Sequence, residues 1–241
     1  MHPCIDPAGG YPCYLVKRDH ISNKKHLKNS STIKIIILVV LAILMFSPMF
    51  VLHQIGPFDF WWWMSTNLAV LLAICILSDP DYLTLLKQDL RERILRKTGI
   101  GLLSALLLYI VFFIGNYLSR KWFNFAGQGI ENVYKFKGDA AGIRIALLMI
   151  LVIGPGEELF WRGYLQRKIS LKTGKWAGLI IGLILYTGVH IFTGNFMLIM
   201  AALICGFFWG WIYLKYNSMA INVISHTVWD IVVFLLLPFS H

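Results

Sequence analysis

The sequence predicts an all-α protein, a polytopic bundle of about seven or eight transmembrane helices with a polar cavity inside the membrane. Of the 241 residues, 58% are apolar and 14% are charged, and the mean hydropathy is +0.67, which excludes the soluble globular class. Several apolar runs approach the roughly 20 residues that a spanning helix requires. Ionisable residues interrupt the runs of the second half, where charge is costly and marks a function.

The distribution of polar and apolar residues divides the chain into three parts. Residues 1–32 form a polar, basic N-terminal tail, residues 33–138 hold the first transmembrane helices, and residues 139–238 hold the later ones. No cleavable signal peptide precedes the first apolar run, so this run is expected to act as a signal anchor. The predicted spans are Ile33–Leu52, Phe58–Ser78, Gly99–Leu118, Ala140–Ile153, Trp176–Phe192, Phe196–Leu214 and Met219–Pro238.

The fourth of these runs is too short to span a membrane alone, and Gly154, Pro155 and Gly156 follow it. In one interpretation, the helix that begins at Glu157 completes the span. In the other, the glycines and proline break the helix and leave a second half-helix, residues 157–169, buried against protein. The two alternatives predict seven and eight spans, respectively.

The net charge of +10 does not indicate nucleic-acid binding, because the basic residues lie in short loops beside apolar runs. With seven crossings, the basic tail, the loop after the second run and the stretch after Arg162 share one side. The positive-inside rule then predicts a cytoplasmic N-terminus. The 119–139 loop carries Arg120, Lys121, Lys135 and Lys137 on the opposite side and weighs against this orientation. Eight spans would invert the later half.

The first polar motif is Glu157-Glu158-x-x-x-Arg162. Adjacent residues on a helix point about 100° apart, so the two carboxylates are not expected to share a task. Glu158 precedes Arg162 by four residues, the favourable order for an ion pair on one helix face. We therefore predict a structural Glu158–Arg162 pair and a separate carboxylate, Glu157, that faces a cavity.

Two further motifs place polar groups one helical turn apart in apolar runs. Tyr186-x-x-x-His190 contains a single histidine, which in a soluble protein is more often a satisfied core residue. His226-x-x-x-Asp230 is compatible with a local hydrogen bond that joins helices. Three such motifs on different helices can converge only inside the bundle, where they would supply a base for water and groups that stabilise an oxyanion.

These three motifs resemble those of the CPBP intramembrane proteases, also called the Abi or CAAX-protease group, which are similar to the endoprotease that trims prenylated CAAX proteins. The family pattern is EExxxR, then FxxxH, then HxxxN or HxxxD, and the similarity covers roughly residues 140–238. Tyr186 stands where the family usually has Phe, which adds a hydroxyl.

The resemblance implies roles for these residues. Glu157 would be the general base that activates water, and His190 would help to hold that water. His226 and Asp230 would form the oxyanion site. Glu158 and Arg162 would support the site structurally, as their spacing also predicts. Residues 139–238 would then form a protease core of this type, and the expected activity is hydrolysis of a peptide bond in a membrane-associated, prenylated or precursor substrate.

The cofactor remains open at this stage. Two histidines and carboxylates suit zinc as ligands, and Glu157, His190, His226 and Asp230 would be the candidates. The chain has no HExxH, the motif that indicates a zinc protease most strongly. We prefer metal-free activation of water by Glu157 over a divalent metal.

The expected partners are the lipid bilayer and a membrane-bound peptide or protein, with no nucleic acid. The short chain, basic tail and modest loops favour a multi-pass protein of the bacterial cytoplasmic membrane. The alternative function is a non-catalytic protein of the same fold, either a bacteriocin self-immunity protein or a scaffold.

Overall fold

The computed structural model describes residues 24–239, and for residues 24–31 it describes the backbone alone. Most of the predicted tail, residues 1–32, lies outside the described residues. The chain divides into two compact units, residues 1–41 and residues 42–241. Helix α2, Lys24–Leu52, crosses this division, so its first half belongs to the first unit. All the residues of the candidate site belong to the second.

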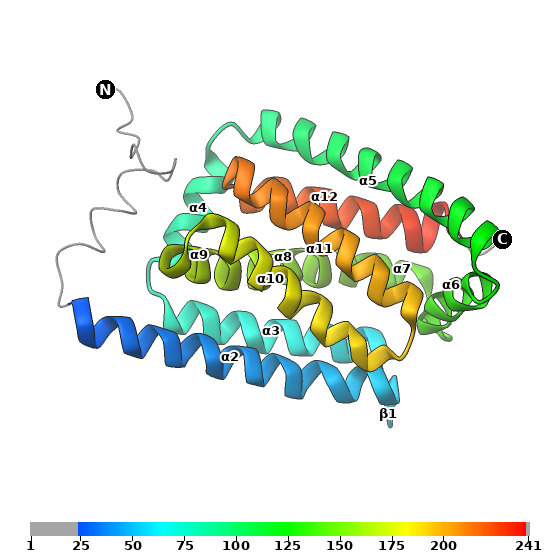
Figure 1. Ribbon diagram of the computed structural model, residues 1–241, viewed down its shortest axis with the longest axis horizontal. Helices are drawn as coiled ribbons and strands as arrows, with labels where there is room; N and C mark the ends of the chain where they lie inside the picture. The colour runs from blue at the N-terminus through cyan, green and yellow to red at the C-terminus, as the bar shows by residue number, and fades with distance from the viewer. Residues whose placement is uncertain (1–23, 240–241) are drawn as a thin grey trace. The chain divides into compact units, whose positions relative to one another are not determined.

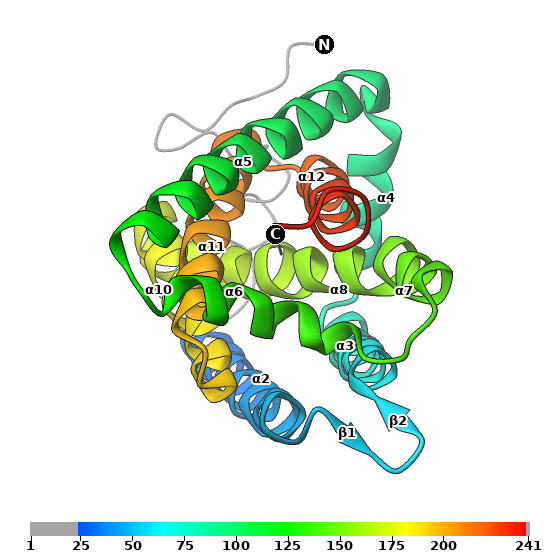
Figure 2. The same ribbon diagram turned by 90° about the vertical axis from the view of Figure 1, so that its right-hand side faces the viewer.

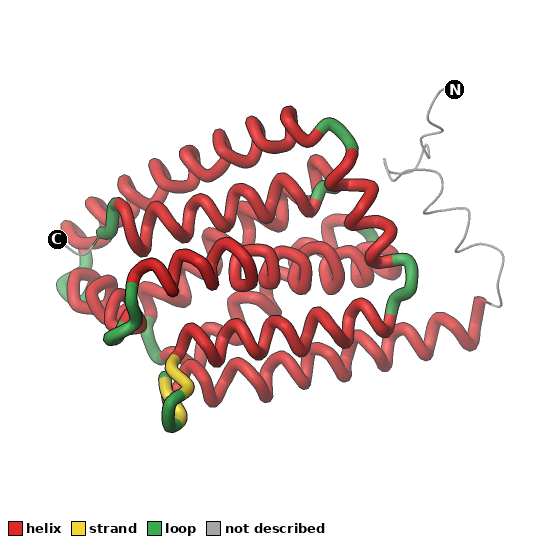
Figure 3. Tube along the Cα trace, turned by 180° about the vertical axis from the view of Figure 1, so that it is seen from behind, coloured by secondary structure: helices red, strands yellow, loops and turns green. Residues whose placement is uncertain are grey.

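The second unit is helical almost throughout, which confirms the all-α prediction. Within residues 24–239, strands occur as one antiparallel hairpin, in which Ile55 pairs with Phe58 (Figure 3). The elements of the N-terminal half after α2 are β1 (Gln54–Ile55), β2 (Phe58–Asp59), α3 (Phe60–Ser78), α4 (Tyr82–Arg91), α5 (Ile94–Trp122), α6 (Ala126–Tyr134) and the 3-10 helix η1 (Lys135–Lys137).

The second half begins with a helical run from residue 142 to residue 173 that alternates between two helix types. Its elements are α7 (Gly142–Leu148), the π-helix η2 (Met149–Ile153), α8 (Gly154–Glu158), the π-helix η3 (Leu159–Gln166) and α9 (Arg167–Thr173). The Gly-Pro-Gly sequence therefore does not break the helix, and the first of the two interpretations of the fourth span is supported. The remaining elements are α10 (Lys175–His190), the 3-10 helix η4 (Ile191–Thr193), α11 (Phe196–Tyr216), α12 (Met219–Ile231) and the π-helix η5 (Val232–Leu236).

The two glycines of this sequence lie where other helices pack closely against α8. A Cβ atom at Gly154 would lie 2.2 Å from Thr227 Oγ1 of α12, and one at Gly156 would lie 3.0 Å from Leu68 Cβ of α3. These glycines allow close helix packing, as small residues commonly do in membrane bundles. Figures 1 and 2 show the consequence, with α8 lying between α12 and α3.

Six helices in the described part of the chain are long and apolar enough to cross a membrane, and the chain is an integral, multi-pass membrane protein. They are Thr32–Leu52, Phe60–Ser78, Ile94–Trp122, Lys175–Thr193, Phe196–Tyr216 and Met219–Leu236. The continuous 142–173 run would add a seventh crossing, so the predicted count of seven or eight stays a prediction. Many apolar side chains on these helices are exposed, as expected for surfaces that face lipid.

The start of α12 is held by a side chain from a distant element. Asp89 of α4 accepts a hydrogen bond from the Ala220 backbone N–H at 2.7 Å and pairs with Lys97 Nζ at 2.7 Å. Ser218 caps the same helix through Ile221 N–H. An anionic group is favourable at a helix N-terminus, where backbone N–H groups lack partners. This contact fixes the helix that carries His226 and Asp230.

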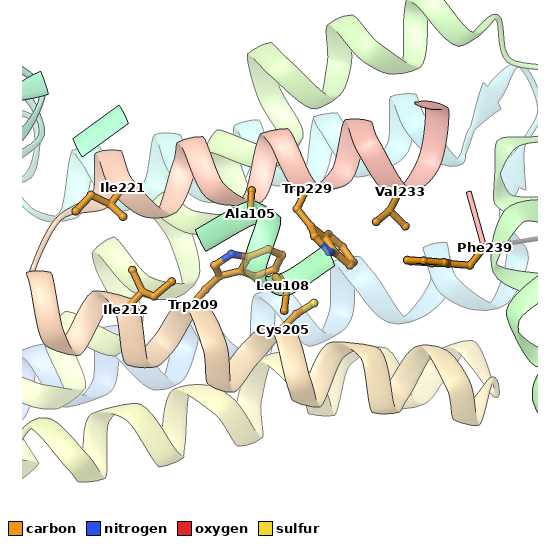
Figure 4. Packing of buried hydrophobic residues seen from close by; sticks show 9 residues of the cluster. All are labelled: Ala105, Leu108, Cys205, Trp209, Ile212, Ile221, Trp229, Val233 and Phe239. Carbon is orange, nitrogen blue, oxygen red and sulfur yellow. The ribbon is translucent and has the colours of Figure 1, made fainter. Parts of the chain in front are cut away.

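The apolar core beside the site extends along α12. Figure 4 shows it from Ile212 and Ile221 at one end, past Trp209 and Trp229, to Val233 and Phe239 at the other. Trp209 comes from α11, and Ala105 and Leu108 of α5 pack against the same cluster. The cluster thus joins three helices around the face of α12 that bears its polar residues.

Candidate functional site

Five polar or aromatic residues of α12 share one buried face because their spacing follows the helical repeat. They are Asn222, Ser225, His226, Trp229 and Asp230, each at most 8% exposed. Burial of polar groups at such a depth is unfavourable unless they find partners. The neighbouring helices supply those partners for most of them.

Glu158 is the centre of the largest network and has 0% exposure. Its Oε1 accepts a hydrogen bond from Arg162 Nη1 at 2.8 Å and lies 2.7 Å from His226 Nδ1, while its Oε2 accepts from Asn222 Nδ2 at 2.9 Å. The predicted ion pair with Arg162 is therefore present, and α12 adds two further partners. Because donors saturate this carboxylate, it is suited to holding helices together rather than to taking a proton from water.

The Arg162 guanidinium lies between aromatic rings, 4.4 Å from the centroid of Tyr186 and 5.6 Å from that of Trp209. It also lies 3.4 Å, through Nη2, from the Gly206 carbonyl oxygen. Cation–π contacts of this kind stabilise a charge removed from water. Arg162 is thus fixed against α10 and α11 as well as paired with Glu158.

The His226 ring contacts two carboxylates and one aromatic ring. Its Nδ1 faces Glu158, its Nε2 lies 3.4 Å from Asp230 Oδ2, and its ring stacks on Trp209 with centroids 3.7 Å apart. The predicted proximity to Asp230 is present, but the shorter contact is to Glu158. An imidazole between two carboxylates can donate a proton through each nitrogen, which is the arrangement of its charged form.

Glu157 has a different environment from Glu158, although it precedes it directly. Its Oε2 accepts a hydrogen bond from the Tyr186 hydroxyl at 2.9 Å. Its Oε1 has no hydrogen-bond partner within the described residues. The side chain is 6% exposed and lines a cavity. One oxygen is therefore anchored and the other can accept a proton.

His190 lies at the end of α10 and also lines the cavity. Its Nδ1 lies 2.8 Å from the Tyr186 carbonyl oxygen, one helical turn earlier. A carbonyl can only accept, so this contact requires a proton on Nδ1, and in the neutral ring Nε2 is then an acceptor. Tyr186 thus fixes Glu157 through its hydroxyl and His190 through its backbone.

The cavity beside these residues has a volume of about 470 Å³. Its polar lining includes Glu157, Tyr186, His190, His226 and Asp230, and most other lining residues are apolar or aromatic. A volume of this size is typical of sites that bind small molecules. The structure therefore brings all four predicted catalytic residues, Glu157, His190, His226 and Asp230, to one cavity.

A second cavity of about 850 Å³ adjoins the first and is lined by polar loops. The two cavities share Phe60, Trp61, Phe136, Phe196 and Met197. The walls of the second cavity also carry charged residues, among them Asp59, Lys135, Lys137, Asp139 and Arg144, of which Asp59 and Arg144 form an ion pair. It offers a polar approach to the apolar cavity.

The donor geometry does not fit a three-ligand metal centre. Among residues 24–239, no group of three or more His, Cys, Asp and Glu side chains is arranged to hold a metal ion. His226 directs its two nitrogens at Glu158 and Asp230, and Nδ1 of His190 faces a carbonyl. A catalytic zinc site needs three converging protein ligands. We therefore derive no step through a metal.

Three contacts of the site were not predicted from the sequence. Asn222 is not part of the three motifs, although its position four residues before His226 on the same helix indicates a shared face. The Tyr186 hydroxyl was noted without its partner Glu157. Trp209 was not singled out at all, yet it stacks on His226 and donates through Nε1 to Ser225 Oγ at 3.1 Å.

Comparison with known proteins gives one match. Residues 140–232 match the family model described as Type II CAAX prenyl endopeptidase Rce1-like. The matched segment begins two residues before α7, ends one residue after α12 and contains every candidate site residue. A search of curated proteins and a search of solved structures each found no match. The match confirms the resemblance drawn from the three motifs and supports a protease in general.

Proposed function

We propose that this chain, whose residues 140–232 match that endopeptidase family, is an intramembrane endopeptidase that uses Glu157 as its general base. The observation that carries the proposal is the asymmetry of the two adjacent carboxylates. Donors occupy both oxygens of Glu158, whereas Glu157 lines the cavity with one anchored and one available oxygen. A base needs such an available acceptor beside the water that it activates.

The reaction begins with water in the cavity between Glu157 and His190. Glu157 Oε1 takes a proton from this water, and the resulting hydroxide oxygen attacks the carbonyl carbon of the substrate peptide bond. His190 accepts a hydrogen bond from the water through Nε2 and so orients it. Positioning of this kind and proton transfer each lower the barrier to hydrolysis.

The attack places negative charge on the former carbonyl oxygen. His226 stabilises this oxyanion by turning its Nε2–H to it from Asp230 Oδ2, which lies 3.4 Å from Nε2 before the reaction. The tetrahedral intermediate then collapses, the C–N bond breaks, and protonated Glu157 gives its proton to the leaving amine. Glu157 returns to the carboxylate form, and the products are an amine and a carboxylic acid.

The substrate is proposed to be a membrane-associated peptide that carries an apolar chain. The cavity has an apolar lining near the carboxylates, and the matched family is described as a CAAX prenyl endopeptidase. A prenylated cysteine could place its isoprenoid in the apolar cavity while the peptide lies toward the polar one. The short chain, basic tail and modest loops favour a bacterial cytoplasmic membrane, and the distribution of basic loops favours a cytoplasmic N-terminus.

The test is cleavage by purified protein of a farnesylated peptide that ends in a CAAX sequence. Glu157→Gln keeps the shape of the side chain and removes its basicity. We expect kcat to fall about 100-fold or more, because general base catalysis typically contributes this much. Glu131→Gln, a change at an exposed glutamate of α6, is the matched control and should leave kcat unchanged. Full activity of Glu157→Gln would overturn the assignment.

A further inference from the structure

Several buried polar atoms on side chains have no hydrogen-bond partner within residues 24–239. They belong to Trp61, Thr187, Asn222, Thr227 and Trp229. The lining of the apolar cavity includes Trp61 and Trp229 and none of the other three residues. A buried donor that lacks an acceptor destabilises the folded state, so such a group requires an explanation. Two indole N–H donors beside the cavity therefore lack an acceptor in the described chain.

Neighbouring aromatic rings hold both indoles in place. Trp61 is 3% exposed and lies edge to face with Phe234, with ring centroids 5.8 Å apart. Trp229 is 8% exposed and lies edge to face with Phe112 at 4.8 Å and Trp209 at 5.7 Å. The face of an aromatic ring is a weak acceptor for an N–H group, and a carbonyl oxygen is a stronger one. Both donors are thus fixed in position and can gain a hydrogen bond from a ligand.

The two indoles lie at different points along the cavity. Trp229 directly precedes Asp230 on α12 and follows His226 by three residues, so it lies beside the proposed oxyanion site. Trp61 lies at the start of α3 and lines the polar second cavity as well as the apolar one. A peptide that extends from the oxyanion site into the second cavity would therefore meet Trp229 first and Trp61 where the cavities join.

We propose that the indole N–H groups of Trp61 and Trp229 form a subsite that binds two backbone carbonyl oxygens of the substrate peptide. The inference rests on the proposed function, since a peptide that reaches Glu157 brings carbonyl groups through the cavity. An extended peptide has no internal hydrogen bonds, and its carbonyl oxygens need donors where apolar side chains exclude water. An indole supplies one donor on an otherwise apolar ring. The subsite thus recognises the backbone and does not depend on the side chains of the substrate.

The experiment measures binding by the Glu157→Gln protein in detergent micelles and does not require turnover. The probe is the farnesylated peptide of the cleavage assay with a fluorophore at its N-terminus, and its anisotropy reports affinity. Trp61→Phe and Trp229→Phe each keep an aromatic ring and remove the donor. Each should weaken binding about fivefold, the effect of one neutral hydrogen bond. Trp62→Phe and Trp176→Phe, at exposed tryptophans that line neither cavity, are the matched controls and should leave the affinity unchanged.

A second series of peptides separates hydrogen bonding from packing, because phenylalanine is smaller than tryptophan. Single amides of the peptide are replaced by esters, whose carbonyl oxygens are weaker acceptors. The prenyl group is the same in every peptide and cancels from the comparison. For each tryptophan, one ester position should weaken binding when the indole is present and much less when phenylalanine replaces it. If every ester costs the same with and without the indoles, they bind no peptide carbonyl and the inference is overturned.

The outcomes also separate this inference from the proposed function. If the ester effects depend on the tryptophans but the unaltered protein cleaves no peptide, the subsite holds and the catalytic assignment fails. If the unaltered protein cleaves the peptide but Trp61→Phe and Trp229→Phe do not weaken its binding, the hydrolysis stands and the inference fails. A Glu157→Gln protein that does not bind the peptide at all would likewise overturn the inference.

Discussion

The helical run of residues 142–173 supplies the cations that pair with two buried carboxylates, one on the run itself and one on a neighbouring helix. Glu158 is bound by Arg162 at the middle of the run, and Asp79, at the end of α3, is bound by Arg167 and by Lys168 at 2.9 Å. Both carboxylates are neutralised by cations from the run. Neither carboxylate lines the two cavities described above, but Glu158 directly follows the cavity-lining Glu157 and contacts His226 of α12, whereas Asp79 contacts no residue of the candidate site.

This comparison distinguishes carboxylates that hold helices together from a carboxylate that can take part in a reaction. Asp79 joins α3 to α9, and Glu158 joins the run to α12, so both have structural partners on another helix. Of these three carboxylates, Glu157 is the one that lines a cavity, and its Oε1 has no hydrogen-bond donor within residues 24–239. We infer that the availability of a lone pair beside a cavity, rather than burial or a nearby cation, marks the reactive group.

The largest expected effect is the loss of stability in Glu158→Ala. This change leaves Arg162 buried without its anion, and breaking a buried ion pair in this way typically costs about 3–5 kcal/mol. The unfolding temperature of the detergent-solubilised protein and its yield in membranes should both fall sharply. Glu157→Gln provides the comparison within the same helix and should retain the unfolding temperature. Equal stability of the two variants would contradict the division of roles between the glutamates.

A smaller effect is expected for Tyr186→Phe, which removes the donor to Glu157 and keeps the ring beneath Arg162. The carboxylate would lose its anchor, and kcat should fall about tenfold, equivalent to roughly 1.4 kcal/mol. KM should change little, because the hydroxyl contacts Glu157 and not the substrate. Tyr117→Phe, at an exposed tyrosine of α5, is the control for hydroxyl removal. An unchanged kcat would show that Glu157 needs no such anchor.

The smallest effect concerns Asp79 and depends on pH. Burial alone would raise the pKa of Asp79, but hydrogen bonds and charge from Lys168 and Arg167 outweigh it, so the pKa lies below the ordinary carboxyl value. The contribution of this carboxylate to stability is therefore complete above the ordinary pKa of about 4 and is lost as pH falls through the lower pKa of the folded state.

Asp79→Asn should accordingly lower the unfolding temperature at neutral pH, and the difference from the unaltered protein should shrink as the pH falls well below 4. Glu92→Gln, at an exposed glutamate near the end of α4, should show no such difference at either pH. A difference for Asp79→Asn that stayed constant with pH would mean that packing, and not charge, accounts for it.

Local spacing predicted the parts of the fold and site that depend on neighbours along one helix. Hydropathy predicted the apolar helices, and the four-residue spacing of Glu158 and Arg162 predicted their ion pair. The pairing of His226 with Asp230 was predicted on the same basis. These contacts follow from the helical repeat, which the sequence displays directly.

Contacts between distant segments could not be predicted in this way. His226 makes its shorter contact to Glu158, 68 residues earlier, and Tyr186 reaches Glu157 across 29 residues. Gly154 and Gly156 left two local interpretations open, and their close packing against Thr227 and Leu68 of other helices could not be predicted from spacing along the chain. The capping of α12 by Asp89 is also a contact between distant segments, because the sequence near residue 220 does not indicate that Asp89 lies there.

The π-helical turns on both sides of α8 have a consequence for how such a protein can diverge. A π turn contains one more residue than an α turn, and neighbouring positions differ in direction by about 100°. Loss or gain of one residue within η2 or η3 can be absorbed there by a change between π and α turns, which leaves Glu157 and Glu158 facing the same way. The direction of the two carboxylates can thus persist over generations despite single-codon insertions and deletions in the turns on either side of them.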